Sequence, residues 1–392
     1  MPGRRNCAAI NTEPMSTDPT LAERVRSTLR GELTRLSAYP VTPPWAGIKL
    51  ELMEDNHFDP ANDSPRQAAV REELGRRLAR AAFNRYPDPA APRLKALLRE
   101  RFAIADDFDI LLGAGSDELI SLLTLATAGC GGAVVAPEPT FSVFRHATIA
   151  VGGRWVGVPL EADFSLDVDR LLDAIRSEAP RLVWIVYPNN PTGNLFPADA
   201  IERAIAAAPG LVVIDEAYEP FAGGASFLPR LAAHPNLLVM RTLSKIGLAG
   251  VRLGYLVGRP EWIGELNKLR GPFNVGVLGQ VAGEVLLEHY DLLAGHAAQM
   301  IADRERLSAA LARLPGVTVF PSQANFVLAR FRDAETTFQT LKAEGILVRN
   351  LAASHPLLAN TLRLSVGTSD EVDALIAALG RLEQTTRSQP PT

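Results

Sequence analysis

Short apolar runs alternate with longer helix-like segments through the middle of the chain, and this alternation constrains the fold more than any other feature. The runs are rich in valine, isoleucine and leucine and end at glycine, proline or charged residues, as buried strands do. They lie at 109–113, 133–137, 182–188, 211–216, 237–242 and 253–258. Segments between them, such as 116–128, 167–177 and 197–208, suit helices. The alternation predicts an α/β fold, with a mostly parallel sheet, helices on both of its faces, and ligands beyond the carboxyl ends of the strands.

The pattern changes after about residue 270. One long helix is predicted over 281–314, and short strands are predicted at 317–320, 325–329, 346–349 and 362–366. This order is typical of a smaller α+β domain at the C-terminus. We therefore expect the chain to divide into a loose tail over 1–20, an N-terminal arm over 21–62 with a helix at 21–36, a large domain over 63–275 and a small domain over 276–392.

Composition excludes several classes of partner and site. A net charge of −4 gives no electrostatic reason to expect nucleic acid or an anionic membrane as a partner. No apolar run reaches the roughly 20 residues that span a bilayer. The two cysteines, Cys7 and Cys130, belong to no CxxC pair or Cys/His cluster. We therefore expect no metal site and no disulfide framework, and a reducing compartment such as the cytoplasm.

Polar turns follow two of the predicted strands. In LLGAGSDELI, residues Gly115, Ser116 and Asp117 join a strand to a helix. Backbone N–H groups at such a turn can bind an anion, and Ser116 can cap the helix. In YPNNPTG, Asn190 can present its amide to a ligand. Taken alone, each turn is better explained as purely structural.

Two ionisable side chains follow the next strands. Asp215 ends an apolar strand, where a carboxylate needs a cationic or donor partner; a helix cap or a salt bridge explains it equally well. In RTLSKIGLAGVRLGY, Lys245 follows Thr242 and Ser244 and precedes Arg252. Lys245 and Asp215 are then expected at the same edge of the sheet, where a simple ion pair would be enough to explain them. Together with the two turns, however, these residues offer a partner for each group of pyridoxal 5'-phosphate (PLP): its phosphate, ring nitrogen, phenolic oxygen and aldehyde.

A set of ordered motifs then identifies a family. RYPDP, GAGSDE, YPNNPTG, DEAY, TLSK, GLAGVRLGY, ANFVL and LRLSVGT occur in this order between about residues 36 and 382. With them the chain resembles the fold-type I PLP-dependent aminotransferases, and among these the histidinol-phosphate aminotransferases. The resemblance implies PLP as cofactor and a homodimer in which the arm packs against the small domain and the partner subunit.

The resemblance also implies a role for individual residues. Lys245 matches the Schiff-base lysine, and Asp215 matches the partner of the protonated ring nitrogen. Tyr218 and Asn190 match the residues that hold the phenolic oxygen, and Phe141 matches the ring that stacks on the cofactor. The phosphate ligands implied in the same way are Gly115, Ser116, Thr242, Ser244 and Arg252, and Asp117 at the helix start is expected to bind the cofactor through its backbone N–H.

Substrate recognition is implied by a second group of matches. Arg349 and Arg363 match arginines that hold substrate anions. A guanidinium suits that role, because it binds carboxylate or phosphate in a two-pronged geometry. Tyr39 matches a tyrosine near the substrate phosphate, and Asn190 also faces the substrate. The implied reaction moves an amino group between L-histidinol phosphate and 2-oxoglutarate or glutamate, in histidine biosynthesis.

The sequence departs from the family in places. His57 stands where the family places a tyrosine that reaches the cofactor phosphate of the partner subunit. It could donate to that phosphate or be an inert loop histidine. Phe141 lacks the hydroxyl of many relatives, and the spacing from Lys245 to Arg252 is shorter than in many. These departures leave open a related PLP enzyme with another substrate: an aromatic or natural-product aminotransferase, or an O-phosphoamino-acid decarboxylase. A binding module without turnover is a third hypothesis, which Lys245 and Asp215 disfavour.

Overall fold

A computed structural model describes residues 19–38 and 42–387. The chain divides into two compact units, residues 1–40 and residues 41–392. In the first unit, α1 (Pro19–Thr28) is followed by the short helix η1 (Leu33–Arg35). The single helix predicted over 21–36 is therefore wrong, and Gly31, a poor helix former, lies in the break. Tyr39 lies outside the described residues.

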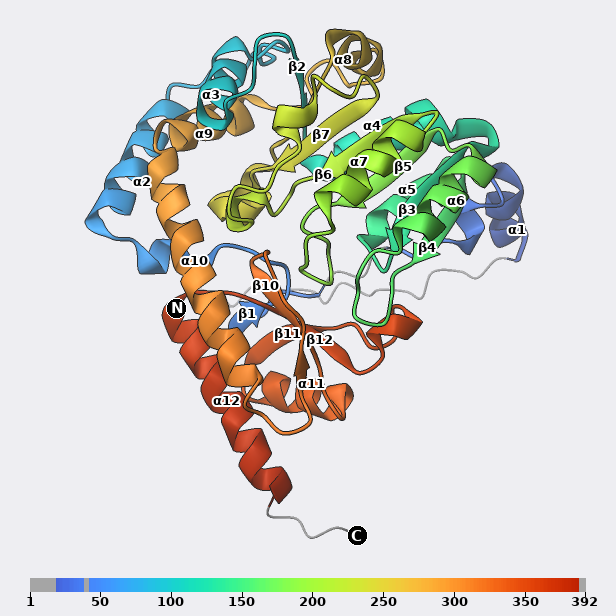
Figure 1. Ribbon diagram of the computed structural model, residues 1–392. Coiled ribbons are helices and arrows are strands. Elements are labelled where there is room, and N and C mark those ends of the chain that lie inside the picture. The colour runs from blue at the N-terminus through green and yellow to red at the C-terminus, as the bar shows by residue number, and fades with distance from the viewer. Residues whose placement is uncertain (1–18, 39–41, 388–392) are drawn as a thin grey trace. The chain divides into compact units, whose positions relative to one another are not determined.

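Within the described residues of the second unit, the larger sheet has seven strands in the order β2-β8-β7-β6-β5-β3-β4 (Figure 1). Only β8 runs antiparallel to its neighbours. The central strands of the seven-stranded sheet, β5, β6 and β7, are buried along their whole length, as expected of a sheet covered on both faces. The strands are β2 (Asp109–Gly113), β3 (Ala133–Glu138), β4 (Arg154–Pro159), β5 (Leu182–Val186), β6 (Leu211–Asp215), β7 (Leu237–Thr242) and β8 (Gly254–Gly258).

The helices that cover this sheet form two groups (Figure 1). Helix α4 packs against α5 in one group, and α6 packs against α7 in the other. The predicted α/β fold with a mostly parallel sheet is confirmed, although β4 was not predicted. The helices of this part are α2 (Pro65–Leu78), α3 (Pro92–Phe102), α4 (Ser116–Ala128), α5 (Ser142–Ala150), α6 (Val168–Glu178), α7 (Ala198–Ala207) and α8 (Pro260–Asn267). None of the helices in the described ranges is long and apolar enough to cross a bilayer.

A smaller sheet, in the order β1-β11-β12-β10-β9, draws its strands from both ends of the unit. The N-terminal strand β1 (Ile48–Leu50) pairs in parallel with β11. The other strands are β9 (Thr318–Val319), β10 (Phe326–Arg330), β11 (Ile346–Asn350) and β12 (Thr361–Ser365). Helix α11 (Ala334–Ala343) packs against β11 and β12, and α12 (Ser369–Arg387) packs against α11. The smaller α+β part is thus present, but β1 was not predicted.

The long helix predicted over 281–314 is in fact two helices, α9 (Val277–Glu288) and α10 (Tyr290–Leu311). They are interrupted at His289, whose backbone leaves the helical region at φ −107° and ψ 31°. The His289 ring contacts the carboxylate of Glu73 on α2, so tertiary contact accompanies the break. An apolar pattern that runs on through such a residue gives no sign of the interruption.

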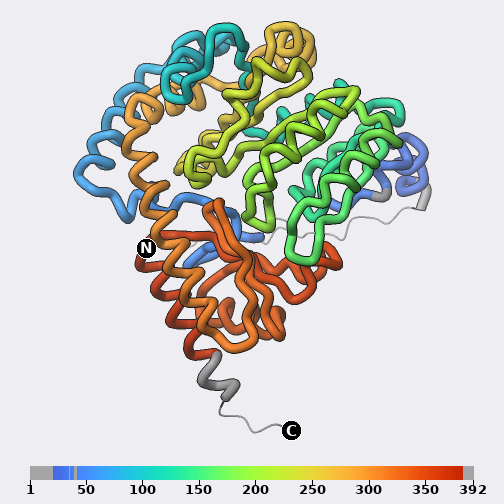
Figure 2. Tube along the Cα trace, in the orientation of Figure 1, coloured from blue at the N-terminus to red at the C-terminus, as the bar shows by residue number. Residues whose placement is uncertain are grey.

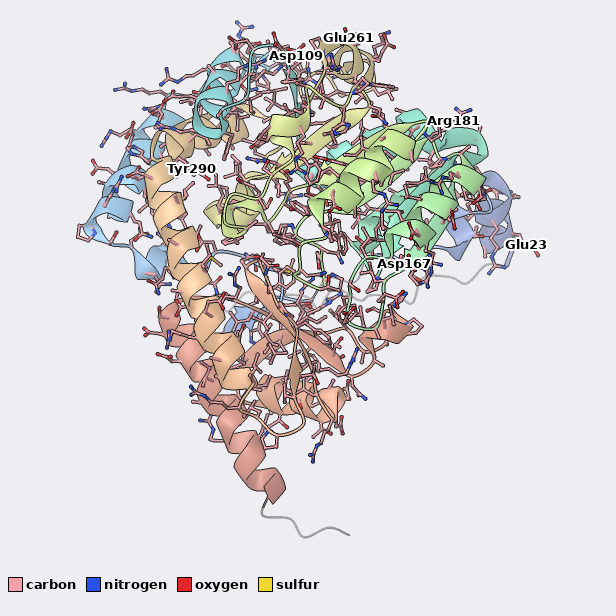
Figure 3. The ribbon with its side chains drawn as sticks, viewed as in Figure 1. Glu23, Asp109, Asp167, Arg181, Glu261 and Tyr290 are labelled. Carbon is pink, nitrogen blue, oxygen red and sulfur yellow. The ribbon has the colours of Figure 1, made fainter. Side chains whose placement is uncertain are left out.

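The carboxyl ends of the parallel strands face the smaller sheet. Figure 3 labels Asp109, the first residue of β2, and Arg181, which directly precedes β5. Both lie at the edge of the large sheet that is turned away from the smaller sheet. At the opposite ends, the turn after β5 bonds directly to β12 through Asn190 and Arg363. The backbone N–H of Gln323, just before β10, also donates to the Gly193 carbonyl at 2.7 Å, and the tube in Figure 2 shows the two parts of the chain close together. Side chains from both sheets therefore meet at one place.

Candidate active site

Lys245 lies in a short π-helical turn, η7 (Ser244–Leu248), directly after β7. Its Nζ donates to the carbonyl oxygen of Leu52 at 3.1 Å. The turn depends on Gly247, which has φ +89°; a Cβ there would lie 3.0 Å from the Cβ of Phe58. Burial, and next the positive charge of Arg363, lower the pKa of the Lys245 amine to about 8. This lysine can therefore exchange a proton near neutral pH, unlike a surface lysine.

Asp215 is buried at the carboxyl end of β6, one strand away from Lys245. Its Oδ1 accepts a hydrogen bond from the backbone N–H of Ala217 at 3.0 Å. Burial raises the pKa of this carboxyl to about 7. A carboxylate in such a position gains most from a ligand that brings a positive charge to it.

Asn190 connects Tyr218 with Arg363. Its Nδ2 donates to the Tyr218 hydroxyl at 3.0 Å, and its Oδ1 accepts from Arg363 at 2.7 Å. Arg363 also lies over the ring of Phe326, with its central carbon 5.5 Å from the ring centroid. All of these side chains are buried. Of the predicted site residues, these three are therefore in one continuous network.

The residues predicted to bind phosphate gather around Arg252. Gly115 has φ +82°, a conformation that favours glycine, and a Cβ there would lie 2.5 Å from the Arg252 guanidinium, which would have to move. Arg252 pairs with Asp117 at 2.9 Å and approaches the Ser244 hydroxyl at 3.5 Å. The Ser244 hydroxyl in turn accepts from Thr242 at 2.9 Å.

Ser116 begins α4, and its N-cap is Gly115. The predicted capping role of Ser116 is therefore wrong, because the residue already belongs to the first helical turn. Its backbone N–H belongs to those at a helix start that lack an intrahelical partner. The helix start adds the positive end of its dipole to the Arg252 group.

Phe141 precedes α5 and is half-buried, with its ring edge-to-face on Phe144 at 5.6 Å between centroids. The preceding residue, Thr140, donates to Asn189 at 3.2 Å, and Asn189 donates to the carbonyl of Pro139. These bonds hold the Phe141 loop against the turn that carries Asn190.

The second substrate-side arginine, Arg349, is bonded to a residue that the sequence did not single out. Its guanidinium donates to Oε1 of Glu51 at 2.6 Å. Arg349 stands directly opposite Arg363 on the neighbouring antiparallel strand, so both side chains lie on the same face of the smaller sheet. Glu51 could have been singled out from the sequence, because it is a carboxylate within the mostly apolar stretch IKLELM.

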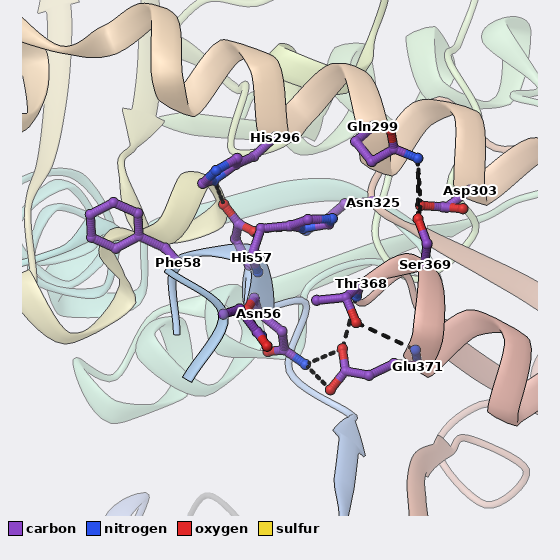
Figure 4. A network of polar contacts seen from close by, with 12 residues as sticks. Asn56, His57, Phe58, His296, Gln299, Asp303, Asn325, Thr368, Ser369 and Glu371 are labelled. Carbon is purple, nitrogen blue, oxygen red and sulfur yellow. Dashed lines mark hydrogen bonds and ion pairs between the residues drawn. The ribbon is translucent and has the colours of Figure 1, made fainter. Parts of the chain in front are cut away.

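His57 is held inside its own chain (Figure 4). Asp55 accepts from His57 at 3.1 Å and from His296 of α10 at 3.2 Å, and the two rings stack at 5.4 Å. Burial opposes it, but the hydrogen bonds from His296 and His57 lower the pKa of the Asp55 carboxyl. Asp55 and His296 were not predicted, since nothing in the sequence links residues 241 positions apart.

The arrangement fits the predicted cofactor, PLP, on the chemistry of its donors. A half-buried amine with a lowered pKa and a buried carboxyl lie at neighbouring strand ends. A guanidinium, two hydroxyls and a helix start together suit a phosphate. In the described ranges, no group of three or more histidine, cysteine or acidic side chains is arranged to hold a metal ion.

Comparisons with known proteins agree with this geometry. The family model described as aminotransferase class I and II matches residues 49–379. Histidinol-phosphate aminotransferase of Chromobacterium violaceum is 48% identical over 91% of this chain and 98% of its own. Histidinol-phosphate aminotransferase 2 of Nitrosococcus oceani is 47% identical with the same coverage. The crystal structure of histidinol-phosphate aminotransferase from Sinorhizobium meliloti in complex with pyridoxal-5'-phosphate has a TM-score of 0.78 at 27% identity, over 92% of this chain and 98% of that one.

Proposed function

The chain belongs to the class I and II aminotransferases, and we propose that it moves an amino group between L-histidinol phosphate and 2-oxoglutarate or glutamate with PLP as cofactor. Relatives at 47 to 48% identity over about nine-tenths of the chain carry the histidinol-phosphate aminotransferase name. The structural observation that carries the substrate proposal is the pair of opposed arginines, Arg349 and Arg363, on one face of the smaller sheet.

Bound PLP supplies an aldehyde that receives the amino group and a ring that withdraws electrons from the substrate. Lys245 would hold the aldehyde and Asp215 the ring nitrogen. Tyr218 and Asn190 would hold the phenolic oxygen, with Phe141 against the ring. The phosphate would be bound by the backbone N–H groups of Gly115, Ser116 and Asp117 and by the side chains of Thr242, Ser244 and Arg252.

Lys245 acts as base and then as acid. Its amine, with a pKa of about 8, takes the proton from the substrate Cα and later returns it elsewhere on the reacting system. At pH 7 the lowering from 10.5 to about 8 raises the unprotonated fraction of the amine from under one in a thousand to about one in ten. The buried surroundings that lower the pKa therefore supply the base.

Asp215 holds a proton at the ring nitrogen by charge. A carboxyl whose pKa is about 7 when alone becomes a firm anion once a cationic N–H faces it. Burial strengthens that interaction because few water molecules screen it. The residue thus keeps the ring in its electron-withdrawing form.

The two arginines orient the substrates. Arg363, fixed by Asn190, binds the carboxylate next to the reacting carbon of glutamate, while Arg349 binds the distal carboxylate or the phosphate of histidinol phosphate.

The test is a coupled assay of purified protein with histidinol phosphate and 2-oxoglutarate, together with aromatic amino acids and O-phosphoamino acids as competing substrates. We expect glutamate formation to be fastest with histidinol phosphate. Borohydride treatment should fix the cofactor to Lys245, as peptide mapping will show. Labelling of another lysine would refute the assigned cofactor site, and no turnover of histidinol phosphate would refute the substrate.

We further propose a homodimer in the cytoplasm. The supports are the family resemblance of the arm over 21–62 and the low cysteine content. We also propose that the arm ends near residue 62 and that the large domain ends near residue 275. Light scattering at micromolar concentration tests the dimer, which a fully active monomer would exclude.

A further inference from the structure

Glu51 is a buried carboxylate placed beside both substrate-side arginines. It follows β1 directly, and β1 pairs with β11 up to Leu50 and Val348. The next position along each strand therefore brings Glu51 beside Arg349, which in turn faces Arg363 on β12. One negative and two positive side chains form a row across three neighbouring strands.

The contacts of Glu51 reach both cations. Its Oε1 accepts from Arg349 at 2.6 Å and from the Thr42 hydroxyl at 2.7 Å, and its backbone carbonyl accepts from Arg363 at 2.9 Å. The side chain is only 3% exposed. Its second carboxylate oxygen, Oε2, is buried and has no hydrogen-bond partner. An oxygen left in this state keeps its full negative potential close to Arg349.

Arg349 remains open to ligands in spite of this pairing. Its side chain is 24% exposed and lines a cavity of about 410 Å³. The other lining residues that bear on an anion are Lys342, Asn350, Trp45 and Thr42. An anion that enters the cavity meets a guanidinium whose charge is already partly balanced by Glu51.

We propose that Glu51 is a specificity-determining residue, which acts as the counter-ion of Arg349 and weakens phosphate more than carboxylate at that arginine. The inference rests on the proposed function, in which Arg349 serves both anions. Because Coulomb repulsion scales with the product of the charges, a phosphate dianion is repelled about twice as strongly as a carboxylate. Glu51 therefore lets one arginine bind a phosphorylated substrate without retaining it and still accept a dicarboxylate.

The experiment compares Glu51→Gln with wild-type holoenzyme. The change removes the charge and keeps the shape. We expect the Kd of inorganic phosphate, measured by calorimetry, to fall about tenfold, and that of a monocarboxylate such as butyrate to fall about threefold, as two units and one unit of charge product predict. The KM of histidinol phosphate should fall with the phosphate Kd, while kcat stays level or decreases as product release slows.

Matched variants separate this effect from general loss of charge or structure. Glu335→Gln removes one exposed negative charge on α11 that bonds Asn350 rather than an arginine, and it should leave the phosphate Kd unchanged. In an Arg349→Ala background, Glu51→Gln should no longer tighten phosphate, since phosphate then lacks the guanidinium that holds it beside Glu51.

Unchanged or weaker phosphate binding in a folded Glu51→Gln holoenzyme overturns the proposal, and so does equal tightening of phosphate and butyrate. Should that variant not fold, Glu51→Asp, which withdraws the carboxylate by one carbon, gives the same test with a smaller shift. If the enzyme ignores histidinol phosphate while Glu51→Gln still tightens inorganic phosphate selectively, the proposed substrate fails and the role of Glu51 stands.

Discussion

Replacing Lys245 with methionine is expected to stabilise the cofactor-free protein at pH 7. The folded protein lowers the pKa of this amine from 10.5 to about 8, so its charged form is disfavoured in place. A shift of that size corresponds to about 3 kcal/mol of destabilisation when the lysine is protonated, at 1.36 kcal/mol per unit. Methionine has a similar shape and no charge.

Two corrections reduce this figure. Methionine cannot donate to the Leu52 carbonyl, and losing such a bond costs about 1 kcal/mol. The lysine is also partly accessible to water, which screens its charge. We therefore expect Lys245→Met to raise the free energy of unfolding by about 1–2 kcal/mol at pH 7.

The pH dependence gives the sharper test. Between about pH 8 and pH 10.5 the unfolded chain keeps the Lys245 proton while the folded chain has released it, so wild-type stability rises with pH in that window. The advantage of Lys245→Met should then shrink across the window and reverse above it, where only the lost bond to Leu52 remains. Urea unfolding of both proteins at pH 7, 9 and 10.5 measures this.

Lys268→Met is the control, because Lys268 is exposed and pairs only with Glu265 next to it on the surface. It should change stability little at any of these pH values. A Lys245→Met protein that is less stable than wild type at pH 7, or a difference that does not shrink as pH rises, would show that burial does not destabilise the lysine.

Other residues give further predictions. Arg363→Ala should lower kcat/KM for glutamate about thirty- to a thousandfold, since a charge-assisted two-pronged contact is lost; steady-state kinetics with an unchanged value would contradict its role. Asp215→Asn should abolish the loss of stability that cofactor-free wild type shows as pH rises from about 4 to about 7, because the raised pKa disfavours the folded anion there; thermal melts across that range check it. Asp55→Asn should cost about 1–3 kcal/mol at neutral pH through the bonds to His57 and His296, and the deficit should shrink as pH falls below about 4; urea unfolding at pH 7 and pH 3.5 measures both.

The sequence predicted the large sheet well because its signals are local. Buried strands such as β5 and β6 are short, continuous apolar runs, and the residue that ends each one is visible beside it. Asp215, Asn190 and Lys245 could be predicted for that reason. Their roles stay predictions, but their place at the carboxyl ends of neighbouring strands followed from strand order alone.

What escaped prediction depends on contacts between distant residues. Strand β1 has three residues, too few for a periodic signal, and exists because β11 lies beside it. Glu51 gains its meaning from Arg349, which is 298 positions away. The break at His289 leaves the apolar pattern intact, and only the packing of α9 and α10 reveals it.

The joining of β1 to β11 also affects how the protein matures during its synthesis. The Glu51 carbonyl and Arg363 are separated by 312 positions, and Lys245 and Leu52 by 193. The large sheet can form on the ribosome from consecutive strands and helices, but the substrate arginines cannot be placed until β11 and β12 have emerged. A growing chain therefore holds β1 and its acidic neighbour without partners for most of translation. Premature termination before β11 would release a polypeptide with the strands of the large sheet and its lysine but neither substrate-side arginine.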